Sequence, residues 1–125
     1  MGRSSTRRNA LSAAVLNSDL DYLRWGDNPN LEEYDLVVNT TPAGAADILA
    51  DSLFPGKCSL LFDVIYKPWP TVLASRWSDC GGDVISGLEL LLYQAIAQLT
   101  LVLARDLDQE EMATHLRPVL LAASH

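Results

Sequence analysis

The sequence predicts an α/β fold in which a partial, doubly wound parallel sheet of three to four strands is flanked by helices. Residues 36–39 and 59–66 form apolar runs that are typical of strands buried on both faces. Residues 83–85 predict a third short strand, and the intervening segment 71–79 has helical spacing. Strands that alternate with helix-length connections are the pattern of parallel sheets with right-handed crossovers.

The composition indicates one folded domain and excludes several classes of partner. Of the 125 residues, 49% are hydrophobic and 20% are charged, which is a globular composition. The formal net charge of -7 argues against general binding to nucleic acids or to anionic membranes, because both need a basic surface. We expect a single domain, in which residues 106–125 form a final helical segment after residues 1–105.

Cysteine use and the amino terminus bear on metals and on the compartment. Cys58 and Cys80 are far apart in the sequence and form no CxxC or Cys/His cluster, so neither a disulfide framework nor a zinc site is expected. The basic amino-terminal segment lacks the apolar core of a secretory signal. These features favour a cytoplasmic protein without a bound metal.

The amino-terminal segment predicts either an anion site or a solvated basic start. A helix is expected over residues 5–15, because a Ser or Thr at positions 4–6 can cap it and apolar residues follow at helical spacing. Arginine near a helix N-terminus is unfavourable with the helix dipole, so Arg3, Arg7 and Arg8 need another explanation. A bound phosphate would provide one, since guanidinium groups and N-terminal amides both attract anions. The spacing alone does not decide between the two readings.

The first predicted strand runs into a corner, residues 39–44, with the sequence NTTPAG. At the carboxyl end of a parallel strand, ligands bind in the crevice that such a corner borders. Residues 20–23 predict an edge strand, residues 31–34 a helical turn and residues 45–54 a short helix. Asp63 is the one charged residue of the second apolar run, and we expect it to be satisfied by local backbone or to lie at the strand's end.

The carboxyl-terminal part predicts two helices. Residues 88–105 are apolar almost all round, but four polar residues recur through them and would be costly in lipid, so a helix buried on two sides is favoured over a membrane span. Residues 106–108 break this helix, and residues 109–122 predict a final one. Its expected apolar stripe consists of Met112, Leu116, Val119 and Leu120. His115 has no second potential metal ligand at suitable spacing, so we assign it no chemistry.

Four motifs, in order, resemble the NADP-binding part of the shikimate dehydrogenase family over about residues 2–105. The first, GRSSTR at residues 2–7, resembles the family's Asn-Arg-Thr-x-x-Arg, which holds the adenosine 2′-phosphate and selects NADP over NAD. The resemblance implies this role for Arg3, Ser4 and Arg7, although a glycine replaces the family's first Asn.

The second motif is the NTTPAG corner, which resembles the family's Asn-Ala-Thr-Pro-x-Gly loop beside the adenosine and ribose of the cofactor. Asn39, Thr41 and Pro42 are therefore implied to border NADP. The third, DVIYKPWPT at residues 63–71, resembles Asp-x-x-Tyr-x-Pro-x-x-Thr. It implies that Ile65 lies by the nicotinamide and that Tyr66 reaches toward the substrate.

The fourth motif resembles the family's Asp-Gly-Leu-x-Met-Leu-x-x-Gln, with Ser86 in place of the Asp. It implies that the Gly87 carbonyl lies by the nicotinamide amide and that Gln94 hydrogen-bonds a substrate hydroxyl. A glycine suits the first role because it lets a backbone approach a flat ring closely. We expect Gln94 to be buried in its apolar helix, where an amide needs a polar partner.

The resemblance implies a Rossmann-like fold and the interconversion of 3-dehydroshikimate and shikimate, with hydride transfer from or to NADP in aromatic amino-acid biosynthesis. The family's proton-transferring Lys and Asp precede the region that this chain resembles, and no GxGxxG turn occurs in it. We therefore assign no catalytic residue and expect the 125-residue chain to be inactive alone.

Two alternatives stay open beside this interpretation. The related quinate/shikimate dehydrogenases share the same motifs. The chain could also be a non-catalytic folded remnant that acts as a self-associating module. In either case we expect a homo-oligomer, because the long apolar helix and the edge of an incomplete sheet would otherwise be exposed.

Overall fold

The computed structural model describes residues 21–24, 26–27 and 29–124. The chain divides into two compact units, Met1–Asn30 and Leu31–His125. The helix expected over residues 5–15 lies outside the described residues. In the described part of the first unit, residues 21–23 have no regular secondary structure, so the expected edge strand is wrong there. A tight turn follows at once, in which the amide of Asp27 donates to the carbonyl of Arg24 at 3.1 Å.

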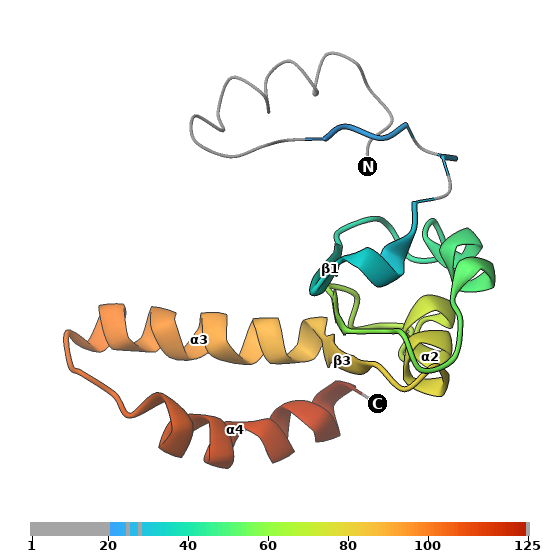
Figure 1. Ribbon diagram of the computed structural model, residues 1–125. Helices are drawn as coiled ribbons and strands as arrows, with labels where there is room; N and C mark the ends of the chain where they lie inside the picture. Colours follow the sequence, from blue (N-terminus) through green and yellow to red (C-terminus); the bar gives the residue numbers. More distant parts are fainter. Residues whose placement is uncertain (1–20, 25, 28, 125) are drawn as a thin grey trace. The chain divides into compact units, whose positions relative to one another are not determined.

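The second unit is built on a three-stranded parallel sheet in the order β1-β2-β3, as the sequence predicts. The strands are β1 (Leu36–Asn39), β2 (Leu60–Asp63) and β3 (Asp83–Ser86), shown in Figure 1. The predicted run 59–66 is therefore a strand only in its first half, because the segment before the two prolines leaves the sheet. Leu36 pairs with Leu60, and Leu60 pairs with Asp83, so all three strands end at the same level.

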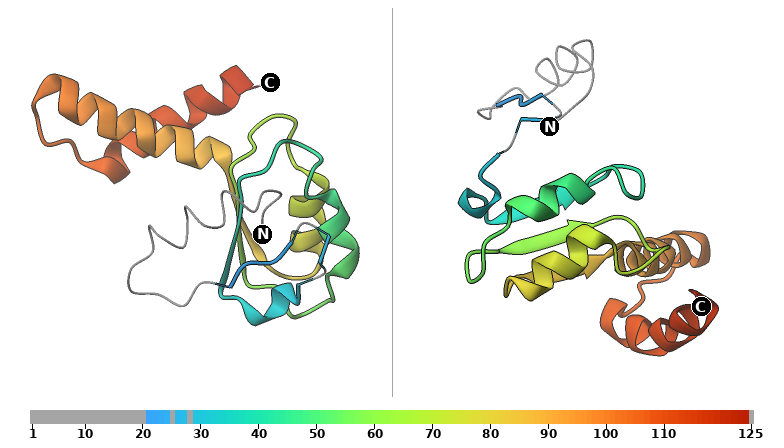
Figure 2. Two further views of the ribbon diagram at one scale, coloured as in Figure 1. Left: turned by 90° about the horizontal axis from the view of Figure 1, so that it is seen from above. Right: turned by 90° about the vertical axis from the view of Figure 1, so that its right-hand side faces the viewer.

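One face of the sheet is covered by two short helices. The 3-10 helices η1 (Leu31–Glu33) and η2 (Asp47–Ser52) occur where helical turns are predicted, and α2 (Val72–Asp79) joins β2 to β3. In the left view of Figure 2, η2 and α2 both lie on one side of the strands. The core between them consists of Leu31, Ala46, Ala50, Leu53, Leu61, Leu73, Ala74, Trp77 and Cys80.

Helix α2 begins and ends as its sequence predicts. The Thr71 hydroxyl accepts a hydrogen bond from the amide of Ala74 at 3.0 Å, which caps the first turn. At the other end Gly81 has φ of +87°, the left-handed conformation that glycine adopts without strain. The fully buried Trp77 anchors the helix to the sheet, because its indole Nε1 donates to the carbonyl of Ser59 at 3.2 Å.

The two cysteines lie beside this helix as free thiols. Cys80 is buried at its end, and Cys58 is half-buried nearby. Burial, together with the neighbouring Cys80, raises the pKa of the Cys58 thiol to about 11. At neutral pH the Cys58 side chain is therefore a protonated thiol and a weak nucleophile.

The expectation that β1 is buried on both faces is wrong. Val37 faces the core, whereas Leu36 is 50% exposed and Val38 is 49% exposed. Alternate residues of a strand point to opposite faces of the sheet. In the second unit, the described helices η2 and α2 pack on one face only, so the other face of β1 stays open to solvent.

The carboxyl-terminal part is a hairpin of two long helices, α3 (Gly87–Leu103) and α4 (Gln109–Ser124), which lie side by side in Figure 1. Ala104, in the left-handed conformation, ends α3 just before the predicted break. A second core joins the helices and consists of Leu92, Ile96 and Ala113 with Tyr93, Met112, Leu116 and Leu120 around it.

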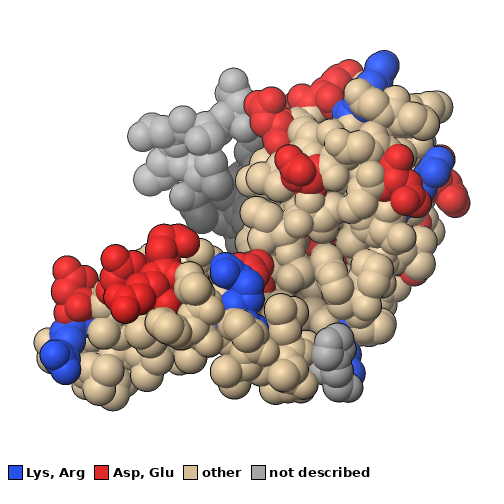
Figure 3. Space-filling view, turned by 90° about the horizontal axis from the view of Figure 1, so that it is seen from below, with Lys and Arg blue, Asp and Glu red and all other residues tan. Residues whose placement is uncertain are grey.

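Burial of α3 on two sides is not what the structure shows. Leu101 and Val102 are each 81% exposed, because α4 covers only one side of the helix. Val119, expected in the apolar stripe of α4, is also exposed. Figure 3 shows that acidic side chains gather on one side of the hairpin and that a broad uncharged area lies beside them. Within the described residues, no helix is long and apolar enough to span a membrane.

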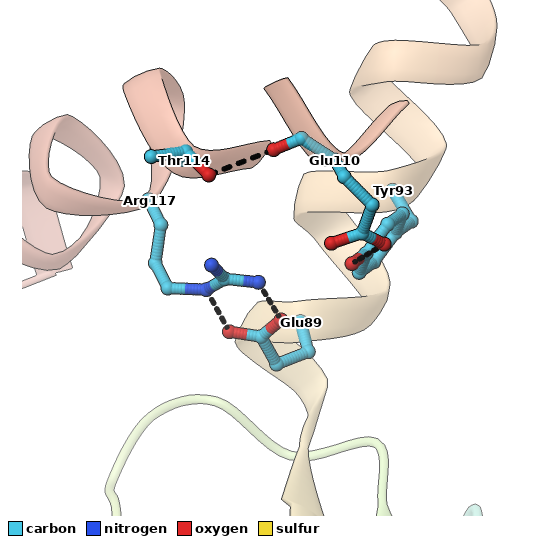
Figure 4. A network of polar contacts seen from close by, with 5 residues as sticks. All are labelled: Glu89, Tyr93, Glu110, Thr114 and Arg117. Carbon is cyan, nitrogen blue, oxygen red and sulfur yellow. Dashed lines mark hydrogen bonds and ion pairs between the residues drawn. The ribbon is translucent and has the colours of Figure 1, made fainter. Parts of the chain in front are cut away.

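An ion pair fixes α4 to the first turns of α3 (Figure 4). Arg117 donates through Nε to Glu89 Oε1 at 2.8 Å and through its second nitrogen, Nη2, to Oε2 at 2.9 Å. This two-pronged contact lowers the pKa of Glu89 and raises the pKa of Arg117. Tyr93 adds a hydrogen bond from its hydroxyl to Glu110 Oε1 at 3.1 Å. These contacts hold the first turn and the middle of α4 against the first two turns of α3.

Candidate functional site

The carboxyl ends of the three strands form the candidate site. Asn39 at the end of β1 pairs with Asp63 at the end of β2, and Asp63 pairs with Ser86 at the end of β3. The parts of the second, third and fourth sequence motifs that follow each strand therefore start from one edge of the sheet. In open α/β sheets this edge is where ligands bind.

A buried carboxylate ties two of these strand ends together. Asp63 is fully buried, and its Oδ1 accepts hydrogen bonds from Asn39 Nδ2 and from the amide of Ile65, each at 3.1 Å. Its Oδ2 accepts from the Thr71 hydroxyl at 2.7 Å. The expectation of a local backbone partner at the strand's end is confirmed. The contacts to Asn39 and Thr71 are partners that the sequence argument missed.

The Asn39 side chain shapes the corner that follows β1. Its Oδ1 accepts from the Thr41 amide at 3.1 Å and from the Thr41 hydroxyl at 2.7 Å. Asn39 is buried, Thr41 is half-buried and Pro42 is exposed. The polar groups of Asn39 are engaged within the chain, and its side chain holds the shape of the loop. The exposed Pro42 and the half-buried Thr41 form the surface of the corner.

Gly87 allows α3 to start directly against the end of β2. Its amide donates to the carbonyl of Ile65 at 3.2 Å. A Cβ atom at this position would meet the carbonyl oxygen of Val64 at 1.9 Å and its carbonyl carbon at 2.4 Å. The glycine is therefore required by a close approach, as expected, but the approaching group in the structure is the chain's own backbone. Contact with a nicotinamide ring stays a prediction.

The predicted substrate-side residues occupy different surroundings. Tyr66 is 50% exposed and lines a pocket of about 390 Å³ at the strand ends. Gln94 is exposed on α3 and is not among the described residues that line this pocket. The argument that a buried amide at Gln94 needs a partner is thus wrong, because α4 covers another side of the helix. Ile65 is half-buried between the sheet and the pocket's loop.

The predicted phosphate clamp, Arg3, Ser4 and Arg7, lies outside the described residues. Within the described part of the chain, no three His, Cys, Asp or Glu residues are grouped as a metal site would require. The carboxylate at the strand ends, Asp63, is buried and its oxygens are engaged with three donors. The described residues at the strand ends therefore form one wall of the candidate site. The polar side chains of this wall mainly hold the wall itself in shape.

Comparison with known proteins gives this wall a context. No family model matches the chain. A protein of Thermosynechococcus vestitus named shikimate dehydrogenase (NADP(+)) is 34% identical over 128 residues, which cover 95% of this chain and 44% of the relative. A Staphylococcus aureus protein of the same name is 31% identical over 104 residues, covering 78% of this chain and 38% of the relative.

Solved structures agree with these relatives. Mycobacterium tuberculosis shikimate dehydrogenase superposes with a TM-score of 0.62 at 37% identity, over 71% of this chain and 34% of that one. A shikimate 5-dehydrogenase from Mycobacterium fortuitum gives a TM-score of 0.54 at 40% identity, over 64% of this chain and 29% of that one. The chain spans less than half the length of these relatives. It is a homologue of shikimate dehydrogenases over that part of their length, and its three-stranded unit is a Rossmann-like portion of their fold.

Proposed function

We propose that this chain supplies the cofactor wall of an NADP-dependent shikimate dehydrogenase, which converts 3-dehydroshikimate, NADPH and a proton into shikimate and NADP. The observation that carries the proposal is the Asn39, Asp63 and Thr71 network at the strand ends, in a chain homologous to enzymes of that name. The network also explains why the second and third motifs contain these residue types. Each of the three side chains holds a strand end or a loop in place.

We propose that the described residues form one side of an NADP site, with Thr41 and Pro42 by the adenosine and ribose and with Ile65 and Gly87 by the nicotinamide. When bound, NADPH supplies the hydride that reaches the substrate carbonyl carbon. Thr41 and Pro42 form a small corner after β1. Ile65 and Gly87 belong to two backbone segments that are hydrogen-bonded to each other. Their role is to orient the cofactor and to exclude water from it. Tyr66 and Gln94 are the residues that we assign to the substrate side.

Arg3, Ser4 and Arg7 complete the proposal as a clamp for the 2′-phosphate of NADP. Arginine is suited to this task because its planar fork forms paired, charge-assisted hydrogen bonds with phosphate oxygens. A bound phosphate would also explain why these arginines are clustered in a chain whose net charge is -7.

Titration calorimetry with NADP and NAD tests this function on the purified 125-residue chain. We expect NADP to bind at least about tenfold more tightly than NAD, since the 2′-phosphate adds charge-assisted contacts. Arg7→Met should remove most of that preference, whereas the matched change Arg105→Met, at an exposed position after α3, should leave it intact. Equal affinity for the two cofactors would contradict the clamp. We also propose that this chain alone does not oxidise NADPH with 3-dehydroshikimate, because it spans less than half of its relatives.

A second candidate function is that of a self-associating module. The exposed apolar residues Leu36 and Val38 on β1, and Leu101 and Val102 on α3, favour it because water-exposed apolar surface is costly. We propose that the chain is a homo-oligomer. Sedimentation velocity should show a species larger than the 13.7 kDa chain, which Leu101→Gln with Val102→Gln shifts toward the monomer. A single monomer boundary for the unchanged chain would contradict this proposal.

A further inference from the structure

A groove of about 430 Å³ lies where the open face of the sheet meets the first turns of α3. Its described lining contains one charged residue, Glu89, and is otherwise formed by Leu36, Leu60, Phe62, Ile85, Leu90 and Tyr93. The carboxylate of Glu89 is held by two nitrogens of Arg117, so a partner in the groove would bury no unpaired charge of these lining residues. Large exposed apolar surfaces of this kind mark sites of interaction.

The same chain carries an exposed apolar side chain that such a groove can receive. Leu101, near the end of α3, is 81% exposed. It is eleven residues after Leu90, which corresponds to about 16 Å along a helix. Figure 1 shows α3 as one continuous helix that runs away from the strands. Leu101 therefore cannot enter the groove of its own chain, but it can enter the groove of a second copy.

Three residues of α3 connect the groove with Leu101. Leu90, Ala97 and Leu101 lie on one side of the helix, because residues seven and eleven positions apart share a face. Ala97, between the other two, is exposed and small, which lets a second helix approach closely. A two-fold axis near the middle of this stripe pairs two α3 helices in opposite directions. Each Leu101 then meets the groove of the other copy, as a self-complementary interface requires.

The charges at the two ends of the stripe are complementary. Asp83 is in register with Leu60, so it lies on the open face of the sheet beside the groove. Arg105 follows Leu101 by four residues, and its amide donates to the carbonyl of Thr100 at 3.3 Å, which keeps it at the end of the helix. Asp83 and Arg105 are exposed, and neither forms an ion pair with a described residue. In the two-fold pair, Arg105 of each copy faces Asp83 of the other.

We propose that two copies of this chain pair through antiparallel α3 helices, with Leu101 of each copy in the groove of the other. This inference rests on the self-association proposed above and names its surface, its partner and its symmetry. Gln94 lies on the same stripe of α3. The pairing therefore deepens the second candidate function and is an alternative to a substrate contact of Gln94.

Ala97→Arg and Ala95→Arg test the stripe as a matched pair. Both alanines are exposed on α3, but residues two positions apart point to different sides of a helix. In sedimentation velocity of the 125-residue chain, Ala97→Arg should give the monomer, because its side chain falls between the two helices. Ala95→Arg should stay a dimer. Circular dichroism should show the helix content of the unchanged chain for both variants, since neither alanine is buried.

Charge reversal tests the antiparallel direction. At low salt, Asp83→Arg and Arg105→Asp should each weaken the dimer about tenfold or more, because each contact occurs twice and reversed charges repel. The double variant restores opposite charges and should recover most of the affinity. Asp51→Arg is the control, because Asp51 is exposed on η2, which packs on the other face of the sheet. It should leave the dimer unchanged.

The possible failures separate this inference from the self-association on which it rests. A single monomer boundary for the unchanged chain would overturn both. An oligomer that persists in Ala97→Arg and in both charge reversals would leave self-association standing and refute this interface. A double variant that associates no more tightly than the single reversals would refute the contact between Arg105 and Asp83, and with it the antiparallel arrangement.

Discussion

Replacing Asp63 with alanine should lower the free energy of unfolding by about 3 to 5 kcal/mol, a large share of the stability of a small domain. The change removes the acceptor of three hydrogen bonds in a fully buried position. Asn39 Nδ2 and the Ile65 amide would then be buried without a partner, which costs more than the loss of the bonds themselves. Urea unfolding followed by circular dichroism measures the effect.

Two further variants show whether the network is the cause. Asp63→Asn keeps the shape and one acceptor oxygen, so it should cost only about 1 to 2 kcal/mol. Asp83→Ala removes an exposed carboxylate at the start of β3 and should change the free energy of unfolding by no more than about 0.5 kcal/mol. Similar losses for Asp63→Ala and Asp83→Ala would show that the buried carboxylate does not hold the strand ends together.

The sheet and its helices are largely readable from the sequence because their signals are local. Apolar runs predict β1 and β2, and helical spacing with a Thr before it and a glycine after it predicts α2. Local sequence patterns do not show which other elements pack against a helix or strand. The sequence shows that α3 is apolar all round, but the exposure of Leu101 and Val102 depends on which of its faces α4 covers.

The candidate site shows the same division between local and distant signals. Sequence motifs find Asn39, Ile65, Tyr66 and Gly87, and the structure places them at or beside the ends of the strands. The bond between Asn39 and Asp63 joins residues 24 positions apart, which no local pattern contains. A signal was present nevertheless, since a lone Asp in an apolar strand must find donors. For Gln94 the helix pattern misleads, because an apolar helix need not be buried at every position.

Replacing Gly87 with alanine should also destabilise the chain strongly, by about 3 kcal/mol or more. In a helix an alanine is normally better than a glycine by about 1 kcal/mol, so local propensity predicts the opposite sign. The difference arises because the new Cβ would lie 1.9 Å from the carbonyl oxygen of Val64, a backbone atom that cannot rotate away. Either α3 or the end of β2 must move, and the amide of Gly87 would lose the Ile65 carbonyl.

Gly81→Ala separates this steric effect from the conformational one. Gly81 has φ of +87° and open space around its missing Cβ, so its replacement should cost only about 1 to 2 kcal/mol, for the left-handed backbone alone. Urea unfolding of both variants gives the comparison, and NMR shifts should spread to Tyr66 only for Gly87→Ala. Equal losses of unfolding free energy in the two variants would mean that α3 can move away from the end of β2 at little cost. A larger loss at Gly87 would mean that this one glycine sets how closely α3 packs against the segment after β2, in which Ile65 and Tyr66 directly follow the backbone that Gly87 contacts.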